Sequence, residues 1–129
     1  MDAAAKVEER LTPSVATTLD MLAAEIELAG ARCIFLDRVI GEVMDGLSDA
    51  HRQRMMQGLH SVDLLAQHLT SLSAFARGMS LAVPADIAAP VHGAIAEITL
   101  GDLAERMMAG LGGGDSDDER ADAGDLDLF

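Results

Sequence analysis

The chain has 129 residues, of which 50% are hydrophobic, and it carries a formal net charge of −13 at pH 7. This length limits it to one domain, with enough apolar residues to build a core. The acidic balance argues against binding to nucleic acid or to anionic membranes, because both are negatively charged, and it favours protein partners.

Aromatic residues make up only 2% of the chain, and Trp and Tyr are absent. The core must then consist of aliphatic and methionine side chains, which favours an all-α fold. The start of the chain lacks the pattern of a signal peptide, and no run approaches the roughly 18 apolar residues of a membrane span, so we expect a cytoplasmic protein. A single cysteine and no Cys/His cluster predict no disulfide, no metal site and no cofactor of its own.

A predicted N-terminal arm, residues 1–12, precedes a predicted helical hairpin domain, residues 13–80. The first long helix is expected to begin after Thr12-Pro13, a hydroxyl that can cap the helix and a proline suited to its first turn. Apolar residues then recur at alternating steps of four and three, which is typical of a coiled coil or bundle helix, and charged residues such as Asp37 lie off this seam. The seam consists of Val15, Leu19, Leu22, Ile26, Ala29, Cys33, Leu36, Ile40, Val43 and Leu47.

The stretch DGLSDAHR separates the first long helix from the second. Gly46 can end the first helix, and Ser48 or Asp49 can cap the second. So short a connection makes the two helices antiparallel neighbours. The second helix is expected to end near Gly78, and its seam consists of Met55, Leu59, Val62, Ala66, Leu69, Ser73 and Ala76.

The apolar arc of the second helix is too broad for a single partner helix, because Leu65, Leu72, Phe75 and Met79 flank its seam. We therefore expect two hairpins to form a four-helix bundle as a homodimer. The alternative is that residues 81–111, which predict short helices, fold back over the hairpin within a monomer.

The last segment, residues 112–129, predicts an acidic flexible tail, because its composition offers little to bury. Its end, DLDLF, places Leu126, Leu128 and Phe129 at the free end of an acidic tether, which predicts a docking peptide. The alternative is a solvated tail whose last residues are apolar by chance.

A polar strip lies within the second helix, in the stretch SVDLLAQHL. Asp63 and Gln67 each follow a seam residue, so both lie on one flank of the apolar stripe, and His60 and Ser71 are candidate partner-binding residues on the same flank. The D-x-x-x-Q spacing also occurs at Asp49 and Gln53, at the start of the helix. A polar strip is often only the solvated side of a helix, so the spacing alone does not identify a catalytic pair.

The hairpin, the DLLAQ motif in the second helix and the acidic linker ending in DLDLF together resemble the bacterial chemotaxis phosphatase CheZ and the smaller CheZ-like proteins called CheT. The resemblance is architectural over about residues 14 to 80 and includes the last few residues. It implies hydrolysis of the aspartyl phosphate on a CheY-type response regulator. The receiver domain would supply the phosphorylated Asp, Mg²⁺ and a Lys, Gln67 would position the attacking water, and Asp63 would pair with that Lys.

Other interpretations of the sequence stay open. A histidine phosphotransfer protein is also a helical bundle, and His60 and His68 lie on the second helix, but the residues after them lack the expected basic and small pattern. A non-catalytic adaptor could bring other chemotaxis proteins together. The DLDLF end also resembles a sliding-clamp-binding peptide, although Asp125 stands where Gln is usual. His51 and His92 have no partner pattern and no assigned role.

Overall fold

The computed structural model describes residues 12–112 and contains four helices in that range. Two are long, α2 (Val15–Met44) and α3 (Asp49–Ala82), and two are short, α4 (His92–Ala96) and α5 (Gly101–Gly112). The described part of the chain contains no strand, which confirms the predicted all-α class. The predictions for residues 1–11 and 113–129 concern parts of the chain outside the described residues.

Ser14 caps the N-terminus of α2. Its hydroxyl accepts a hydrogen bond from the backbone N–H of Thr17 at 3.1 Å, and its carbonyl accepts one from the N–H of Thr18 at 3.1 Å. The helix begins after Thr12-Pro13, as the sequence predicts, but the cap is not the expected hydroxyl of Thr12. Serine takes the role instead, since Ser14 provides both the hydroxyl and the first carbonyl that the helix needs.

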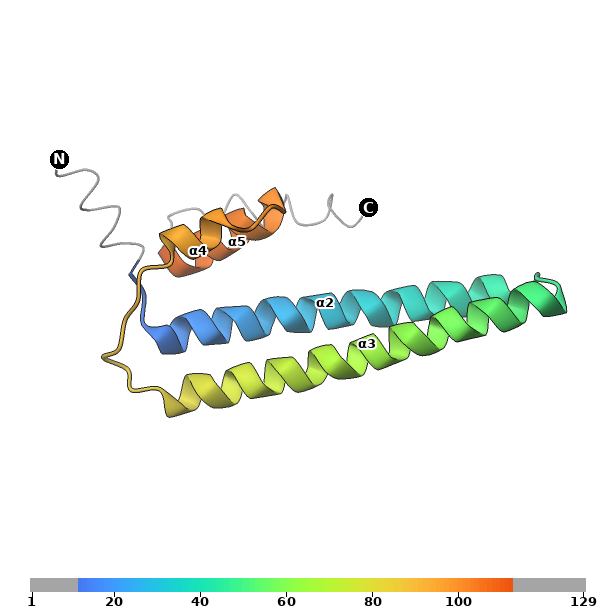
Figure 1. Cartoon of the computed structure of the whole chain (residues 1–129), viewed down its shortest axis with the longest axis horizontal. Helices are drawn as coiled ribbons and strands as arrows, with labels where there is room; N and C mark the ends of the chain where they lie inside the picture. The colour runs from blue at the N-terminus through green and yellow to red at the C-terminus, as the bar shows by residue number, and fades with distance from the viewer. Residues whose placement is uncertain (1–11, 113–129) are drawn as a thin grey trace. The chain divides into compact units, whose positions relative to one another are not determined.

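A turn of four residues, 45–48, joins the two long helices, which run antiparallel and side by side in Figure 1. Ser48 caps α3, because its carbonyl accepts the N–H of Arg52 at 2.8 Å and its hydroxyl the N–H of His51 at 3.5 Å. The guanidinium of Arg52 also donates to the carbonyl of Met44 at 3.4 Å. This bond satisfies one of the carbonyls that the end of α2 leaves open.

α3 continues past Gly78, near which the sequence predicts its end. Glycine is only mildly unfavourable inside a helix, about 1 kcal/mol relative to alanine, and neighbouring residues can outweigh that cost. The helix ends at Ala82, just before Val83-Pro84. Proline disfavours the helical conformation of the residue before it, so Pro84 sets the boundary.

Small residues line the contact between the long helices. Gly30 on α2 is buried, and a methyl group at its position would lie 3.9 Å from Cβ of Leu69 on α3. Ala23, Ser73 and Ala76 are the other buried residues of the two helices. The described residues include no large side chain that is fully buried. A single hairpin therefore leaves much of its apolar surface in water.

The seam of the first helix separates into two rows. Ile26, Cys33 and Ile40 are half-buried, whereas Leu36 and Val43 are exposed at 47% and 53%. A hairpin partner covers only one side of an apolar stripe this wide. The exposed row is consequently available to another helix.

The chain divides into two compact units, and residues 22–82, most of the hairpin, form one of them. The other unit combines the start of α2 with the segment after residue 82. An isolated bridge pairs Ser14 with Ala88, and the N–H of Val15 donates to the carbonyl of Ile87 at 2.8 Å. These bonds attach the segment before α4 to the first turn of α2.

The core of this second unit is small. Val91, Ile95 and Leu111 are buried together, and Met21 and Ala104 pack against them.

Within residues 12–112, none of the helices combines the length and the apolar content that a bilayer crossing requires.

Candidate functional site

Asp63 and Gln67 lie near the middle of α3 and are both exposed. They are four residues apart, so their side chains lie one above the other on the same side of the helix. The Gln67 amide forms no hydrogen bond with any residue of the described chain. A continuous helix of 34 residues fixes the spacing of the two groups, which suits a pair that must act together.

The two predicted partner-binding residues on α3 lie next to this pair. At about 100° per residue, Asp63, Gln67, His60 and Ser71 fall within an arc of about 80°. His60 and Ser71 are exposed. The structure thus brings the four residues onto one side of α3, as the sequence predicts, and it places His68 about 140° away from Asp63.

Two further polar residues of α3, Thr70 and Gln53, are separate from this group. The hydroxyl of Thr70 donates to the carbonyl of Ala66 at 2.9 Å, so it is occupied by its own helix. Gln53 lies almost three turns before Asp63 and borders a shallow depression with Ala50, Arg54 and Gln57. The second D-x-x-x-Q copy is therefore separate from the first.

Asp37 on α2 is part of the site and was not identified from the sequence. It is half-buried, and its Oδ1 atom is shielded from solvent and lacks a hydrogen-bond partner in the described structure. Burial raises the pKa of the Asp37 carboxyl, and the neighbouring carboxyl of Asp63 raises it further. The two carboxyl groups thus approach each other across the hairpin.

Asp37 lies among the half-buried residues of α2, whereas the sequence predicts it off the seam. It lies four residues after Cys33 and three before Ile40, both half-buried. This spacing places all three on one side of α2. The signal was present in the sequence, but a charged residue next to a seam is usually solvated, and only the register between the helices brings Asp37 close to Asp63.

This carboxyl pair predicts a measurable effect of pH on stability. Because the pKa of Asp37 is higher in the folded chain than its ordinary value of 3.8, the folded state binds more protons above pH 3.8. The stability from this group is fully present in acid and is lost as pH rises through the raised pKa. We expect Asp37→Asn to melt at a higher temperature than the wild type at pH 7, with the difference shrinking toward pH 4.

Thermal unfolding at several pH values measures this difference. Glu42→Gln is the matched control, since Glu42 is an exposed carboxylate on the same helix, about 140° from Asp37. Its melting temperatures are expected to follow those of the wild type across the range. If the Asp37→Asn and Glu42→Gln profiles run parallel, Asp37 has no raised pKa.

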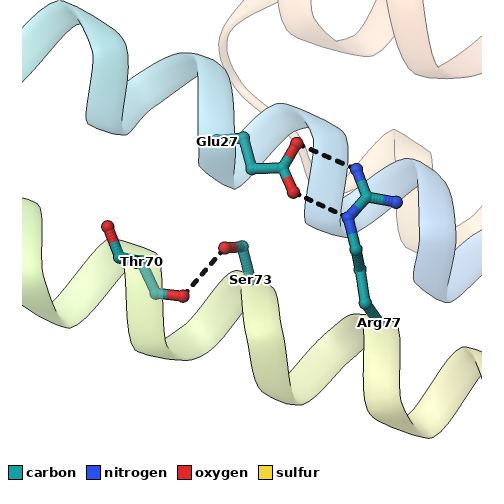
Figure 2. A network of polar contacts seen from close by, with 4 residues as sticks. All are labelled: Glu27, Thr70, Ser73 and Arg77. Atoms are coloured by element: carbon teal, nitrogen blue, oxygen red, sulfur yellow. Dashed lines mark hydrogen bonds and ion pairs between the residues drawn. The ribbon is translucent and has the colours of Figure 1, made fainter.

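An ion pair between the helices identifies one face of the hairpin. Nε and Nη2 of Arg77 donate to the two carboxylate oxygens of Glu27 at 2.6 and 2.8 Å, as Figure 2 shows. The hydrogen bond from Arg77 holds the pKa of Glu27 below its usual value. Asp63 precedes Arg77 by 14 residues, close to four turns, so it lies within about 40° of the same side of α3. We call this side of the hairpin the ion-pair face.

The opposite side of the hairpin is apolar. Six exposed apolar residues are spaced by seven or fourteen along their helices. They lie roughly 120–180° around α2 from Glu27 and around α3 from Arg77. They are Leu22, Leu36 and Val43 on α2 and Leu65, Leu72 and Met79 on α3. We call these six residues the apolar face. Asp63 and Gln67 lie away from it.

No group of three or more metal-ligating side chains occurs within residues 12–112.

A family model described as "Domain of unknown function (DUF8776)" matches residues 11–129. The searches of curated proteins and of solved structures returned no match. The predicted docking residues Leu126, Leu128 and Phe129 lie outside the described residues.

Proposed function

We propose that this chain, which belongs to the DUF8776 family, is a phosphatase that promotes hydrolysis of the aspartyl phosphate on a CheY-type response regulator. The observation that carries the proposal is the exposed pair Asp63 and Gln67, one turn apart on a long helix. Asp63 forms no ion pair with a cationic side chain of the described chain. Its carboxylate, with Asp37 beside it, makes a negative site for a cation from a partner protein.

The chemistry requires little from the phosphatase. The receiver domain holds the phosphorylated aspartate, a Mg²⁺ ion and a lysine. A water molecule attacks phosphorus, the bond between phosphorus and the carboxylate oxygen breaks, and inorganic phosphate leaves with the aspartate regenerated. Gln67 orients this water, because a side-chain amide can accept a hydrogen bond from water while it donates another. Asp63 binds the receiver lysine and sets the position of Gln67.

An exposed helix can serve as the active site because the receiver supplies the pocket. His60 and Ser71 border the pair on the same arc and would contact the receiver surface. The experiment that tests the function is the loss of phosphate from phosphorylated CheY-type receivers when the purified protein is added. A cytoplasmic location is part of the proposal, since the partner is a cytoplasmic signalling protein.

The proposed active form is a homodimer in which the apolar faces of two hairpins pack into a four-helix bundle. The exposure of Leu36 and Leu72, 47% and 53%, supports this arrangement. The ion-pair face lies on the other side of each hairpin, so dimerisation would leave both copies of Asp63 and Gln67 accessible. The tail peptide ending at Phe129 is proposed to tether the receiver, and removal of residues 125–129 is expected to weaken receiver binding.

The dimer is tested by Leu72→Asp. Burying a leucine contributes roughly 1.5–3 kcal/mol, and a symmetric dimer loses this twice, so we expect the dissociation constant to rise on the order of 100-fold or more. Ile34→Asp is the matched control, because Ile34 is 60% exposed but lies on the side of α2 that bears Glu27. Sedimentation over a range of concentrations measures the effect. A wild-type chain that stays monomeric at high concentration contradicts the proposal.

A non-catalytic adaptor is the second candidate. The six residues of the apolar face support it, since an apolar surface of this kind can bind a partner without any chemistry. The two candidates differ in the phosphate assay, where an adaptor binds the receiver but leaves its rate of phosphate loss unchanged.

A further inference from the structure

Arg38 is an exposed cation beside the carboxyl pair. It follows Glu27 by 11 residues, close to three turns, and so lies within about 20° of the same side of α2, on the ion-pair face. Glu27 contacts Arg77 and Gly30 lies against Leu69, and this antiparallel register places Arg38 opposite the turn of α3 that contains Asp63. Arg38 and Asp63 therefore lie on one face and at one level, on neighbouring helices.

Arg38 forms no ion pair within the described residues, although two carboxyl groups lie nearby. The other arginine of this face, Arg77, is held by Glu27 in a two-bond contact. Packed helices lie about 8–10 Å apart, and an extended arginine side chain covers much of such a distance. The guanidinium of Arg38 can thus reach a group that is bound beside Asp63.

The charge of Arg38 matches the chemistry of that group. An acyl phosphate carries its negative charge on the phosphoryl oxygens, and this charge spreads over them as the bond to the leaving carboxylate breaks. A guanidinium offers two parallel donors that fit two such oxygens. Asp63 and Asp37 would repel the phosphoryl group, whereas Arg38 would attract it.

We propose that Arg38 contacts the phosphoryl oxygens of the receiver's phosphoaspartate and stabilises their charge as phosphate leaves. The inference rests on the proposed function, and it adds a residue from α2 to a site otherwise formed by α3. Asp63 would bind the receiver lysine and Gln67 would hold the attacking water. Arg38 would contact the phosphoryl group that is transferred to this water.

The test compares Arg38→Ala with Arg32→Ala. Arg32 is also exposed and lies on the same helix, but about 120° around it from Arg38. We expect Arg38→Ala to lower the maximal rate of receiver dephosphorylation by about 10-fold to 100-fold, the loss of one charge-assisted contact. Arg38→Lys is expected to restore part of the rate, and Arg32→Ala to match the wild type.

Binding separates a phosphoryl contact from general surface charge. Affinity is measured for the receiver with and without beryllofluoride, which occupies the phosphoryl position. We expect Arg38→Ala to weaken binding to the beryllofluoride form only. If the wild type is active, two results overturn the role of Arg38 and leave the proposed function standing. One is equal weakening of binding to both forms of the receiver. The other is identical rates for Arg38→Ala and Arg32→Ala. An inactive wild type overturns the proposed function, and the role of Arg38 with it.

Discussion

Replacing Gln67 by alanine is expected to slow receiver dephosphorylation by on the order of 100-fold or more. The methyl group of alanine cannot hold a water in line with phosphorus, so the attack loses its orientation. The side chain of Gln67 is exposed and forms no hydrogen bond within residues 12–112, so the fold and the dimer are expected to stay intact. Single-turnover loss of phosphate, followed at saturating phosphatase, measures the rate apart from binding.

Gln53→Ala is the matched control for this variant. Gln53 belongs to the second D-x-x-x-Q copy and is also exposed on the same helix, but it lies near the turn between the helices. We expect its rate to equal that of the wild type. If Gln67→Ala and Gln53→Ala behave alike, Gln67 does not position the water, and the adaptor becomes the better description.

Replacing Asp63 by alanine is expected to reduce both rate and affinity. Its proposed partner is the receiver lysine, and a charge-assisted hydrogen bond at a partly exposed site is worth about 10-fold or more in binding. The rate falls as well, because Gln67 then loses its register with the phosphoryl group. Asp37 remains in the variant, but it is half-buried and cannot take the place of Asp63 on the surface.

Affinity for the beryllofluoride form of the receiver and the rate at saturation separate the two effects. Asp49→Ala is the matched control, since Asp49 is the acid of the second copy and lies at the first residue of α3. A loss of rate with full affinity would place the lysine contact elsewhere than at Asp63.

The long helices were predictable because their signals are local. Apolar spacing, the short connection around Gly46 and the cap at Ser48 all act within a few residues, so they indicate a hairpin without knowledge of the partner helix. The helix ends were less predictable. Gly78 predicts an end that the helix does not have, because Pro84 determines the boundary instead.

The site was predictable only in part. Asp63 and Gln67 share a helix, so their spacing follows from the helical repeat. The contribution of α2 depends on which residues of the two helices face each other, and no local pattern contains that register. The position of Asp37 therefore does not follow from the sequence, and neither does the face on which Arg38 lies, because the Glu27–Arg77 ion pair identifies that face.

The same limit applies to the predicted seam. Its steps of four and three do not distinguish the row that faces α3, which includes Cys33, from the row that stays exposed, which includes Leu36. One stripe can serve two partners, and only packing assigns each row to one of them.

The most direct measurement of the central claim is the rate at which a phosphorylated CheY-type receiver from the same genome loses phosphate when the wild-type protein is added. We expect the rate to rise with the concentration of the protein, to saturate, and to require Mg²⁺ on the receiver. A rate that stays at the receiver's own value for every such receiver, at concentrations where binding is complete, contradicts the phosphatase function.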